Sequence, residues 1–504
     1  MKKLVSRFMA VLMAMTMVLS MSMTAFAVEA PTGTLTVNNT VAGKTLDLYQ
    51  IFTATKSGDN VAYTLNSAYE GFFKTKVENG SSLSGEALSE AAYNYVKTQV
   101  GTDGKNGVAF AKDILGWILD NDTTVASTHT TANTTDGTTV INNLDYGYYV
   151  VYPLGATDTS AAPGAQDYTS VASLVSVTGT DATVNMKSNY PTVVKKVNDK
   201  NADDVNIGDT VTYTLTSKVP DMTGYTTYVF NFKDTLSTGL TFKEITSVKV
   251  GNTTLTKVEA GQEANDTYTL TQAGQNITIT MNNFLASNAN KAGQEIKVTY
   301  TATLNKEAVT GFDPNTNKAT VEYSNKPGTD GKGESEPSKV DVHTFNFTIF
   351  KYYLKGETKT GLANAEFELY KANEAGDAAD TNAKINIVEE RNGVYRQATP
   401  EEAKATDFTS AKIVSDDDGK VLVKGLDAGI YYLRETKAPE GYNKLLSDIK
   451  VEIKANYNET TGKLTSYSVD YTYNGKTTNG PAIQEKDNSP EVAVENKTGA
   501  QLPS

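Results

Sequence analysis

Cysteine is absent from this sequence of 504 residues, and histidine and tryptophan are nearly absent, with two copies and one copy respectively. Without cysteine the chain can form neither a disulfide nor a thiolate metal site, so any covalent cross-link must use other side chains. The two histidines, His129 and His343, lie far apart in the sequence and have no ligand-like residues beside them. We therefore expect no metal, no cofactor and no histidine-based catalysis.

Long apolar runs are also absent, except at the N-terminus. Residues 1–27 combine a basic start, an apolar run and the small-residue site AFA that ends at Ala27, which is the pattern of a secretory signal peptide. No later run is long enough to cross a bilayer. Removing the signal peptide takes away three positive charges and no negative ones, which changes the net charge from −13 to −16. These features predict an acidic, secreted protein with little electrostatic attraction to nucleic acid.

Strand-forming residues are abundant instead. The sequence has 28 Tyr and many Thr and Val, and its strand-like runs are separated by Gly, Asn and Asp, as in β-sandwiches. A mature chain of about 475 residues suggests three domains. We predict a mainly β protein of three tandem Ig-like sandwich domains, at residues 28–189, 190–340 and 341–498. In the first, the stretches GEALSEAAYNYVKTQV and GVAFAKDILGWILD have helical spacing and predict two inserted helices.

Three polar side chains of the last domain fall on strand faces that otherwise consist of core residues. Successive side chains of a strand point to opposite faces, so every second residue shares a face. The polar residues and the apolar residues that share their faces are Lys351 with Phe347 and Ile349, Glu435 with Tyr431 and Leu433, and Asn496 with Val492 and Val494.

The middle domain repeats this set in the same order. Its polar residues and their apolar neighbours are Lys195 with Val193 and Val197, Asp234 with Phe230 and Phe232, and Asn317 with Ala319 and Val321. Lys196 is the alternative to Lys195, but the flanking valines favour Lys195 as the inward-facing lysine. Isolated buried charges are costly, so such groups are expected to pair or to shift their pKa values.

A lysine, an acid and an asparagine in one core can form a covalent bond. A desolvated lysine loses its proton and becomes a nucleophile, while a desolvated carboxylic acid keeps its proton and can polarise the asparagine amide. Attack of the lysine on the amide expels ammonia and leaves an isopeptide bond. The alternative is that the lysines extend to solvent, the acids form ordinary salt bridges and the asparagines lie in turns. The ordered repeat in two domains favours the cross-link, which is self-directed chemistry and not enzyme turnover.

Several segments resemble a known family of surface proteins. FKYYLKGETKTGLANAEFELYKA, DDDGKVLVKGLDAGIYYLRETKAPEGY and VENKTGAQLP resemble the collagen-adhesin (Cna) B-type domain of Gram-positive surface proteins, with Glu435 in the position of its E-box. YPTVVKKVND, VPDMTGYTTYVFNFKDTLSTGLTF and NKATVEYSN are similar to the middle domain of sortase-assembled major pilins of the SpaA/FimA type. The resemblance implies an N-terminal pilin domain at 28–189, a middle Cna-type domain at 190–340 and a C-terminal Cna B-type domain at 341–498.

The resemblance also assigns roles to the two sets of residues. It implies isopeptide bonds between Lys195 and Asn317 and between Lys351 and Asn496, and the acids Asp234 and Glu435 would promote them. The first domain departs from the pattern. Aligning YGYYVVYP with AGIYYLRETKAP places Tyr152 where Glu435 stands, so we expect no isopeptide bond there.

Pilins of this family are joined head to tail by a pilus-specific, class C-type sortase, which transfers an LPxTG-like motif to a lysine of the next subunit. Lys187, in TVNMKSN at the first domain boundary, is the best acceptor candidate. The usual YPK motif is absent, so an ordinary solvated lysine is the alternative. Residues 499–504 end in QLPS and resemble a truncated LPxTG-like sorting motif, so as written the chain could not be polymerised.

These features together predict the structural shaft subunit of a cell-wall-anchored pilus on the cell surface, which supports adhesion. The implied partners are a sortase, identical subunits, possible minor pilins and a possible host surface ligand. The alternative is a minor pilin or a wall-anchored adhesin that binds host matrix or glycan. A tip adhesin usually carries an additional binding domain, and none is evident in the sequence, so the shaft subunit is favoured.

Overall fold

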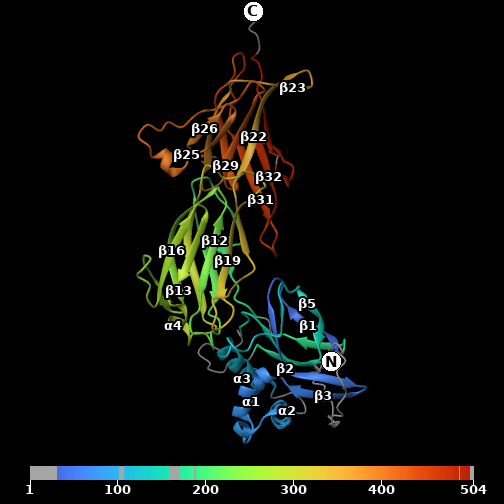
Figure 1. The fold of residues 1–504 in the computed structure, drawn as a ribbon. Helices are drawn as coiled ribbons and strands as arrows, with labels where there is room; N and C mark the ends of the chain where they lie inside the picture. The colour runs from blue at the N-terminus through green and yellow to red at the C-terminus, as the bar shows by residue number, and fades with distance from the viewer. Residues whose placement is uncertain (1–30, 102–106, 158–170, 187–188, 487, 500–504) are drawn as a thin grey trace, which may run out of the picture.

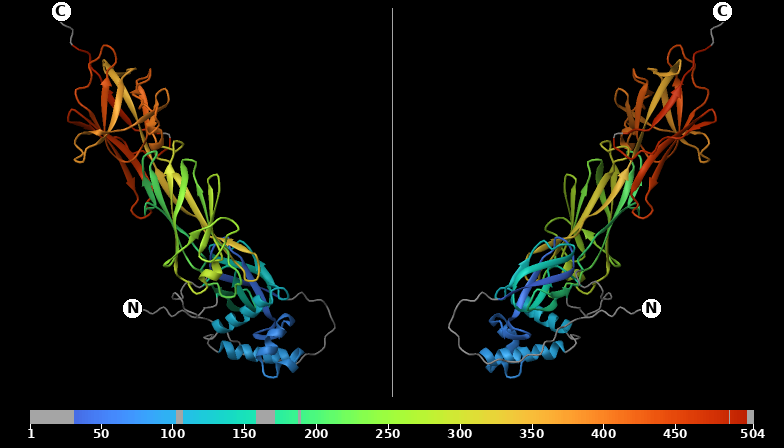
Figure 2. Two further views of the ribbon diagram at one scale, coloured as in Figure 1. Left: turned by 90° about the vertical axis from the view of Figure 1, so that its left-hand side faces the viewer. Right: turned by 90° about the vertical axis from the view of Figure 1, so that its right-hand side faces the viewer.

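The computed structural model describes residues 31–101, 107–157, 171–186, 189–486 and 488–499. The molecule is elongated, with three groups of sheets arranged one after another from the N-terminal to the C-terminal end (Figure 1), and the two side views show the same arrangement (Figure 2). We call these groups the first, second and third units. Strands make up most of the regular structure, which confirms the mainly β prediction. The signal peptide lies outside the described residues.

Among its described residues, the first unit combines two sheets with three α-helices. One sheet has the order β5-β1-β8, and the other has the order β3-β2-β6-β7 with β4 beside β2. The strands are β1 (Thr32–Thr40), β2 (Leu46–Ser57), β3 (Asn60–Leu65), β4 (His129–Thr131), β5 (Gly137–Asp145), β6 (Gly147–Pro153), β7 (Ser173–Val177) and β8 (Ala182–Asn185), and the helices are α1 (Glu70–Lys76), α2 (Gly85–Val100) and α3 (Gly107–Asp120).

Helices α2 and α3 are the two that the sequence predicts. In α2 the buried residues Leu88, Ala92 and Val96 recur every four positions, which places them on one face toward the core. Helix α1 was not expected. It has only seven residues and buries two adjacent aromatic side chains, Phe72 and Phe73, so its sequence carries no helical period.

The second unit is a sandwich of a larger and a smaller sheet. The larger has the order β10-β21-β19-β12-β17-β16-β15 with β20 beside β19, and the smaller has the order β14-β13-β18-β11-β9. The elements are β9 (Val194–Val197), β10 (Ala202–Asp204), β11 (Thr210–Lys218), β12 (Phe230–Leu236), β13 (Leu240–Val250), β14 (Thr253–Thr254), β15 (Thr256–Lys257), β16 (Thr267–Ala273), β17 (Asn276–Met281), α4 (Phe284–Asn288), β18 (Glu295–Leu304), β19 (Asn315–Ser324), β20 (Lys332–Glu334) and β21 (Ser338–His343).

The third unit is also a two-sheet sandwich. One sheet has the order β23-β22-β29-β27-β26 with β34 beside β22, and the other has the order β25-β24-β30-β31-β32-β33 with β28 beside β24. The elements are β22 (Phe345–Lys355), β23 (Thr358–Gly361), β24 (Glu366–Ala372), β25 (Ala379–Lys384), β26 (Ile387–Arg391), β27 (Val394–Gln397), α5 (Pro400–Ala403), β28 (Ile413–Val414), β29 (Lys420–Leu426), β30 (Gly429–Lys437), β31 (Ile449–Tyr457), β32 (Leu464–Tyr473), β33 (Lys476–Thr478) and β34 (Glu491–Glu495).

The second and third units meet in a joint that is almost continuous strand. Strand β21 ends at His343 and β22 begins at Phe345, so a single residue separates them. Asp204 of β10 reaches across the joint, because its carboxylate accepts hydrogen bonds from the Ala428 backbone N–H at 2.6 Å and from the Tyr457 hydroxyl at 2.7 Å. The expected domain boundary at residue 340 lies inside β21, and the boundaries themselves stay predictions.

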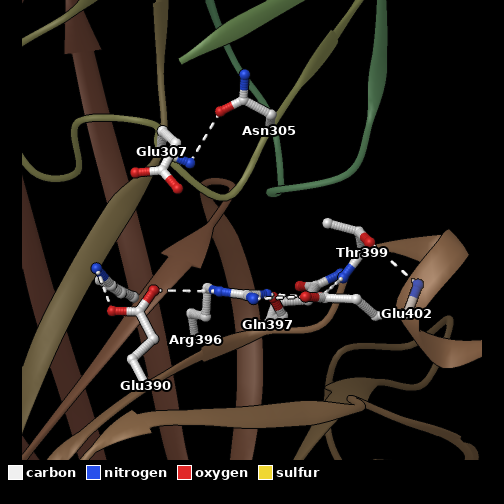
Figure 3. Close-up of polar contacts among 8 residues, drawn as sticks. Asn305, Glu307, Glu390, Arg396, Gln397, Thr399 and Glu402 are labelled. Atoms are coloured by element: carbon white, nitrogen blue, oxygen red, sulfur yellow. Dashed lines mark hydrogen bonds and ion pairs between the residues drawn. The ribbon is translucent and has the colours of Figure 1, made fainter. Parts of the chain in front are cut away.

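A hollow also lies at this joint, between residues 306–308 of the second unit and residues 388–390, Arg396 and Lys424 of the third, and Arg396 is buried. Both terminal nitrogens of Arg396 donate to the Glu402 carboxylate at 2.6 and 2.7 Å, and its Nε lies 3.1 Å from Glu390 (Figure 3). Lys424 also pairs with Glu390, at 2.7 Å. Since the two cations Arg396 and Lys424 are paired with Glu390 and Glu402, we interpret this hollow as part of the contact between the second and third units, and we assign no ligand to it.

The first unit contacts the second through two lysines. Lys44 donates from Nζ to the Tyr323 hydroxyl at 3.1 Å and to the Glu334 carbonyl at 2.7 Å. In the opposite direction, Lys326 of the second unit lies 3.2 Å from the carboxylate of Asp47, which is only 4% exposed.

Candidate functional site

The candidate residues of the second unit meet in the core between its two sheets. Lys195 lies on β9 of the smaller sheet, while Asp234 and Asn317 lie on the neighbouring strands β12 and β19 of the larger sheet. Alternation along each strand turns these side chains inward, and all three residues are at most 1% exposed. Lys196 points away from them and donates to Asn201. The structure therefore places Lys195, and not Lys196, beside the acid and the asparagine.

Lys195 and Asp234 are in direct contact. The lysine Nζ lies 2.5 Å from Oδ2 of the carboxyl group. Burial lowers the pKa of Lys195, although the Asp234 carboxylate opposes that change. Burial also raises the pKa of Asp234, and Lys195 opposes this change. Both shifts favour the neutral forms, a free amine and a protonated acid, which are the forms that an attack on an amide requires.

A tyrosine that the sequence analysis did not single out connects this cluster. Tyr300 of β18 is fully buried, and its hydroxyl accepts from Lys195 Nζ at 2.7 Å and from Asn317 Nδ2 at 2.6 Å. The same hydroxyl donates to Asp234 Oδ2 at 2.8 Å. The Oδ1 atoms of Asp234 and Asn317 are buried and have no hydrogen-bond partner among the described residues. Tyr300 is therefore a fourth member of the site.

The third unit holds its candidate residues in a different arrangement. Lys351 lies on β22, and Asn496 directly follows β34, which pairs with β22 in parallel. Glu435 lies on β30 of the facing sheet. Here the lysine and the asparagine come from adjacent strands and the acid from the opposite side of the core. All three residues are at most 2% exposed.

Glu435 contacts both of the other residues. The Nζ of Lys351 lies 3.0 Å from Glu435 Oε1, and Asn496 Nδ2 donates to Glu435 Oε2 at 3.4 Å. The backbone N–H of Leu445 donates to the same Oε2 at 2.7 Å, and Asn496 Nδ2 also donates to the Asn443 carbonyl at 2.6 Å. The loop after β30 therefore orients both the acid and the amide. Burial lowers the pKa of Lys351 to about 8, against the opposing effect of Glu435.

The first unit does not reproduce this arrangement within its described residues. Tyr152, in the position aligned with Glu435, is buried on β6 and is paired in register with Asp47 of β2. The buried polar and charged residues of 31–101, 107–157 and 171–186 include no lysine. The absence of an isopeptide bond there stays a prediction. Lys187, the candidate acceptor, lies outside the described residues, as do residues 500–504 of the sorting motif.

The described part of the chain contains neither a candidate metal-binding cluster nor a helix that could span a membrane. Its histidine, aspartate and glutamate side chains form no group of three or more that could hold a metal ion. None of its helices is long and apolar enough to span a membrane.

Comparison with known proteins gives two family matches, one in each of the units that contain a buried lysine. Residues 207–327 match the model of the Gram-positive pilin backbone subunit 2, Cna-B-like domain, and residues 352–467 match the SpaA prealbumin-like fold domain. The second unit is thus similar to a pilin-backbone Cna-B-like domain, and the third unit to the SpaA prealbumin-like fold domain. This confirms the resemblance to major pilins with Cna domains that the sequence motifs indicated.

Two curated relatives of this chain are named as a surface protein and as a fimbrial subunit. The trypsin-resistant surface T6 protein of Streptococcus pyogenes is 26% identical over 325 residues, which cover 57% of this chain and 50% of the relative. Fimbrial subunit type 2 of Actinomyces naeslundii is 28% identical over 281 residues, which cover 52% of this chain and 50% of the relative. The chain thus spans about half the length of the curated relatives it matches.

Solved structures of pilins are also similar to this chain. The T6 backbone pilin of Streptococcus pyogenes has a TM-score of 0.48 at 17% identity, with 94% of this chain and 100% of that chain covered. The group B streptococcus pilus 2b backbone protein has a TM-score of 0.42 at 27% identity, with 62% of this chain and 99% of that chain covered.

Proposed function

We propose that this protein is the structural shaft subunit of a covalently polymerised pilus on the cell surface, in which the second and third units are each stabilised by a self-formed isopeptide bond. The observation that carries the proposal is the occurrence of two buried lysine–acid–asparagine clusters, one in each of the two units that a family model matches. The names of the relatives, a surface protein and a fimbrial subunit, support the same function.

The bond-forming reaction is the same in both units. The neutral lysine Nζ attacks the side-chain carbonyl carbon of the asparagine, and a new N–C bond forms. The bond between that carbon and Nδ2 then breaks, and Nδ2 leaves as ammonia after gaining one proton. The lysine nitrogen gives up one proton, so the net change is the loss of one ammonia. The acid moves the proton and polarises the amide, and burial provides the neutral lysine.

The measured mass of the intact mature chain tests the cross-links. We expect the mass to be lower than the sequence mass by two molecules of ammonia, and peptide mapping to find Lys195 joined to Asn317 and Lys351 joined to Asn496. Glu435→Ala should retain only the bond of the second unit, and Asp234→Ala only that of the third unit. An unmodified mass would contradict the proposal.

Polymerisation is proposed to proceed through a pilus-specific sortase, with Lys187 as the acceptor and an identical subunit as the donor. Minor pilins and a host surface ligand would be further partners. The test is whether cells that carry Lys187→Ala in the full-length protein still assemble a ladder of high-molecular-weight pili. Loss of the ladder is expected, while a ladder equal to that of the wild type would exclude Lys187 as the acceptor. Lys196→Ala, which changes a lysine outside the cross-link, is the matched control.

A further inference from the structure

The two acids reach their asparagines in different ways. In the third unit Glu435 Oε2 accepts a hydrogen bond from Asn496 Nδ2 directly. In the second unit the acid is aspartate, which is shorter by one methylene group, and Asn317 Nδ2 donates to the Tyr300 hydroxyl instead. That hydroxyl in turn donates to Asp234 Oδ2. Tyr300 therefore stands between the acid and the nitrogen that must leave.

We propose that Tyr300 is a catalytic residue of the second unit, whose hydroxyl carries the proton from Asp234 to the departing nitrogen of Asn317. The inference rests on the proposed isopeptide bond and adds a residue that the lysine–acid–asparagine set does not contain. Its basis is the contact of one buried hydroxyl with Lys195, Asp234 and Asn317, each at 2.8 Å or less. A general acid–base group must lie within this reach of the atom that it protonates.

The proton transfers balance without any other reactant. After Lys195 attacks, Nδ2 of Asn317 is no longer conjugated and becomes basic. The Tyr300 hydroxyl turns its hydrogen toward Nδ2, which a hydroxyl can do by rotation, and gives up that proton as it receives one from Asp234. Nδ2 leaves as ammonia. The attacking nitrogen then returns a proton to Asp234 through their 2.5 Å contact, so both the tyrosine and the acid end unchanged.

Tyr213 provides a matched control for the role of the hydroxyl. Its ring stacks on that of Tyr300 with the centroids 5.2 Å apart, and it is equally buried. Both rings also lie about equally far from Lys195 Nζ, at 4.8 and 5.0 Å. The Tyr213 hydroxyl, however, forms no hydrogen bond with Lys195 or Asp234 in the described structure. Removing it takes one hydroxyl from the same stacked pair of rings, but none of the three hydrogen bonds that Tyr300 forms with Lys195, Asp234 and Asn317.

The experiment compares Tyr300→Phe with Tyr213→Phe in the full mature chain. Formation of each bond is followed by intact mass and peptide mapping after purification and during incubation at constant temperature. We expect Tyr300→Phe to form the second-unit bond about 100-fold more slowly or not at all, since general acid–base groups contribute factors of this size. Tyr213→Phe should form it as the wild type does. The third-unit bond, formed in the same molecule, shows that the third unit has folded and serves as the internal standard for the mass measurement, while Tyr213→Phe controls for the loss of a hydroxyl from the second-unit core.

A second variant tests whether a longer acid at position 234 can contact Asn317 without the Tyr300 hydroxyl. Adding Asp234→Glu to Tyr300→Phe lengthens the acid to the length found in the third unit, and recovery of the Lys195–Asn317 bond would support the relay. The relay is overturned if Tyr300→Phe forms the bond at the wild-type rate, or if Tyr213→Phe is impaired equally. A wild-type chain that lacks the Lys195–Asn317 bond would instead overturn the proposed cross-link itself, so the two failures are distinguishable.

Discussion

At the scale of single residues, the buried lysines are the most informative feature of this molecule. Lysine is rarely fully buried, because its charged form is costly to remove from water. Lys195 and Lys351 are nevertheless at most 1% exposed, each beside a carboxyl group, and burial lowers the pKa of both. A lysine kept for stability alone would not need an asparagine beside it. The proposed isopeptide reaction, which consumes the lysine, accounts for the combination.

The lowered pKa of Lys351 predicts a pH dependence when the bond cannot form. In Asn496→Ala, Lys351 stays a free amine with a pKa of about 8 in the folded chain, against 10.5 for an ordinary lysine. Between these values the unfolded chain binds one more proton, so the free energy of unfolding of the third unit should rise with pH, by up to about 1.4 kcal/mol per pH unit. At pH 7 and below this group contributes almost no slope, because both states are then protonated.

Pulse proteolysis in urea at pH 7, 8.5 and 9.5 measures this slope from peptides of the third unit. The double variant Asn496→Ala, Lys351→Met is the control and should lack the rise between pH 8.5 and 9.5. Equal slopes in the two variants would show that Lys351 titrates as an exposed lysine does.

At the scale of elements, Asp204 is one of several residues that link the second and third units at their joint. Asp204→Ala would leave the Ala428 N–H and the Tyr457 hydroxyl without their acceptor, and an unsatisfied buried polar group costs about 1–3 kcal/mol. We expect faster hydrogen exchange at the Ala428 amide, measured by mass spectrometry. Asp203→Ala is the control, because Asp203 contacts Asn198 and Lys200 within the second unit. Unchanged exchange in Asp204→Ala would mean that the other links across the joint, such as the Asp427 N–H on Asn206 Oδ1 and the Ile207 N–H on the Gly425 carbonyl, hold it without Asp204.

The sequence predicts the elements and the inward-facing residues better than it predicts their surroundings. Strand alternation is a local property, so the faces of Lys195, Asp234 and Glu435 follow from their immediate neighbours. Tyr300 could not be found in this way, because a tyrosine on an apolar strand face is ordinary core. The sequence indicates only that Tyr300 faces inward with Ile296 and Val298 in the alternating run IKVTYTATL.

Local sequence patterns also could not predict which of the two sheets each strand joins. The asparagine of the second unit lies across the core from its lysine, whereas in the third unit the two lie on adjacent strands. That difference depends on long-range strand pairing. The loop atoms that orient the third site, the Asn443 carbonyl and the Leu445 N–H, depend on the path of irregular backbone, which has no sequence period.

At the scale of the whole molecule, the proposed bonds divide the chain into cross-linked and free parts. The two bonds close loops of roughly 120 and 145 residues, and closing loops of this size stabilises a chain by about 4–5 kcal/mol each. The first unit is expected to have no such bond. Its resistance to heat and to proteases should therefore be the lowest of the three units.

Calorimetry combined with trypsin digestion tests this order. We expect the first unit to unfold at the lowest temperature, and digestion above that temperature to leave a fragment that begins near residue 190. Replacing both Asn317 and Asn496 by alanine should lower the later transitions and leave the first one in place. If the later transitions do not move, the bonds contribute nothing to thermal resistance.

The segment that leads from β19 through the loop and strand β20 to β21 and β22 has a consequence for the proposed fibre under tension. With both bonds formed, a pull that reaches Lys195 passes directly to Asn317 on β19, and a pull that reaches Lys351 on β22 passes directly to Asn496. The rest of each sandwich is bypassed, but residues 317–351 are not. Within them lies the surface loop that contains the exposed residues Gly328, Thr329 and Asp330. One cut by a protease in that loop would sever the fibre, whereas a cut in a bypassed loop would leave it whole.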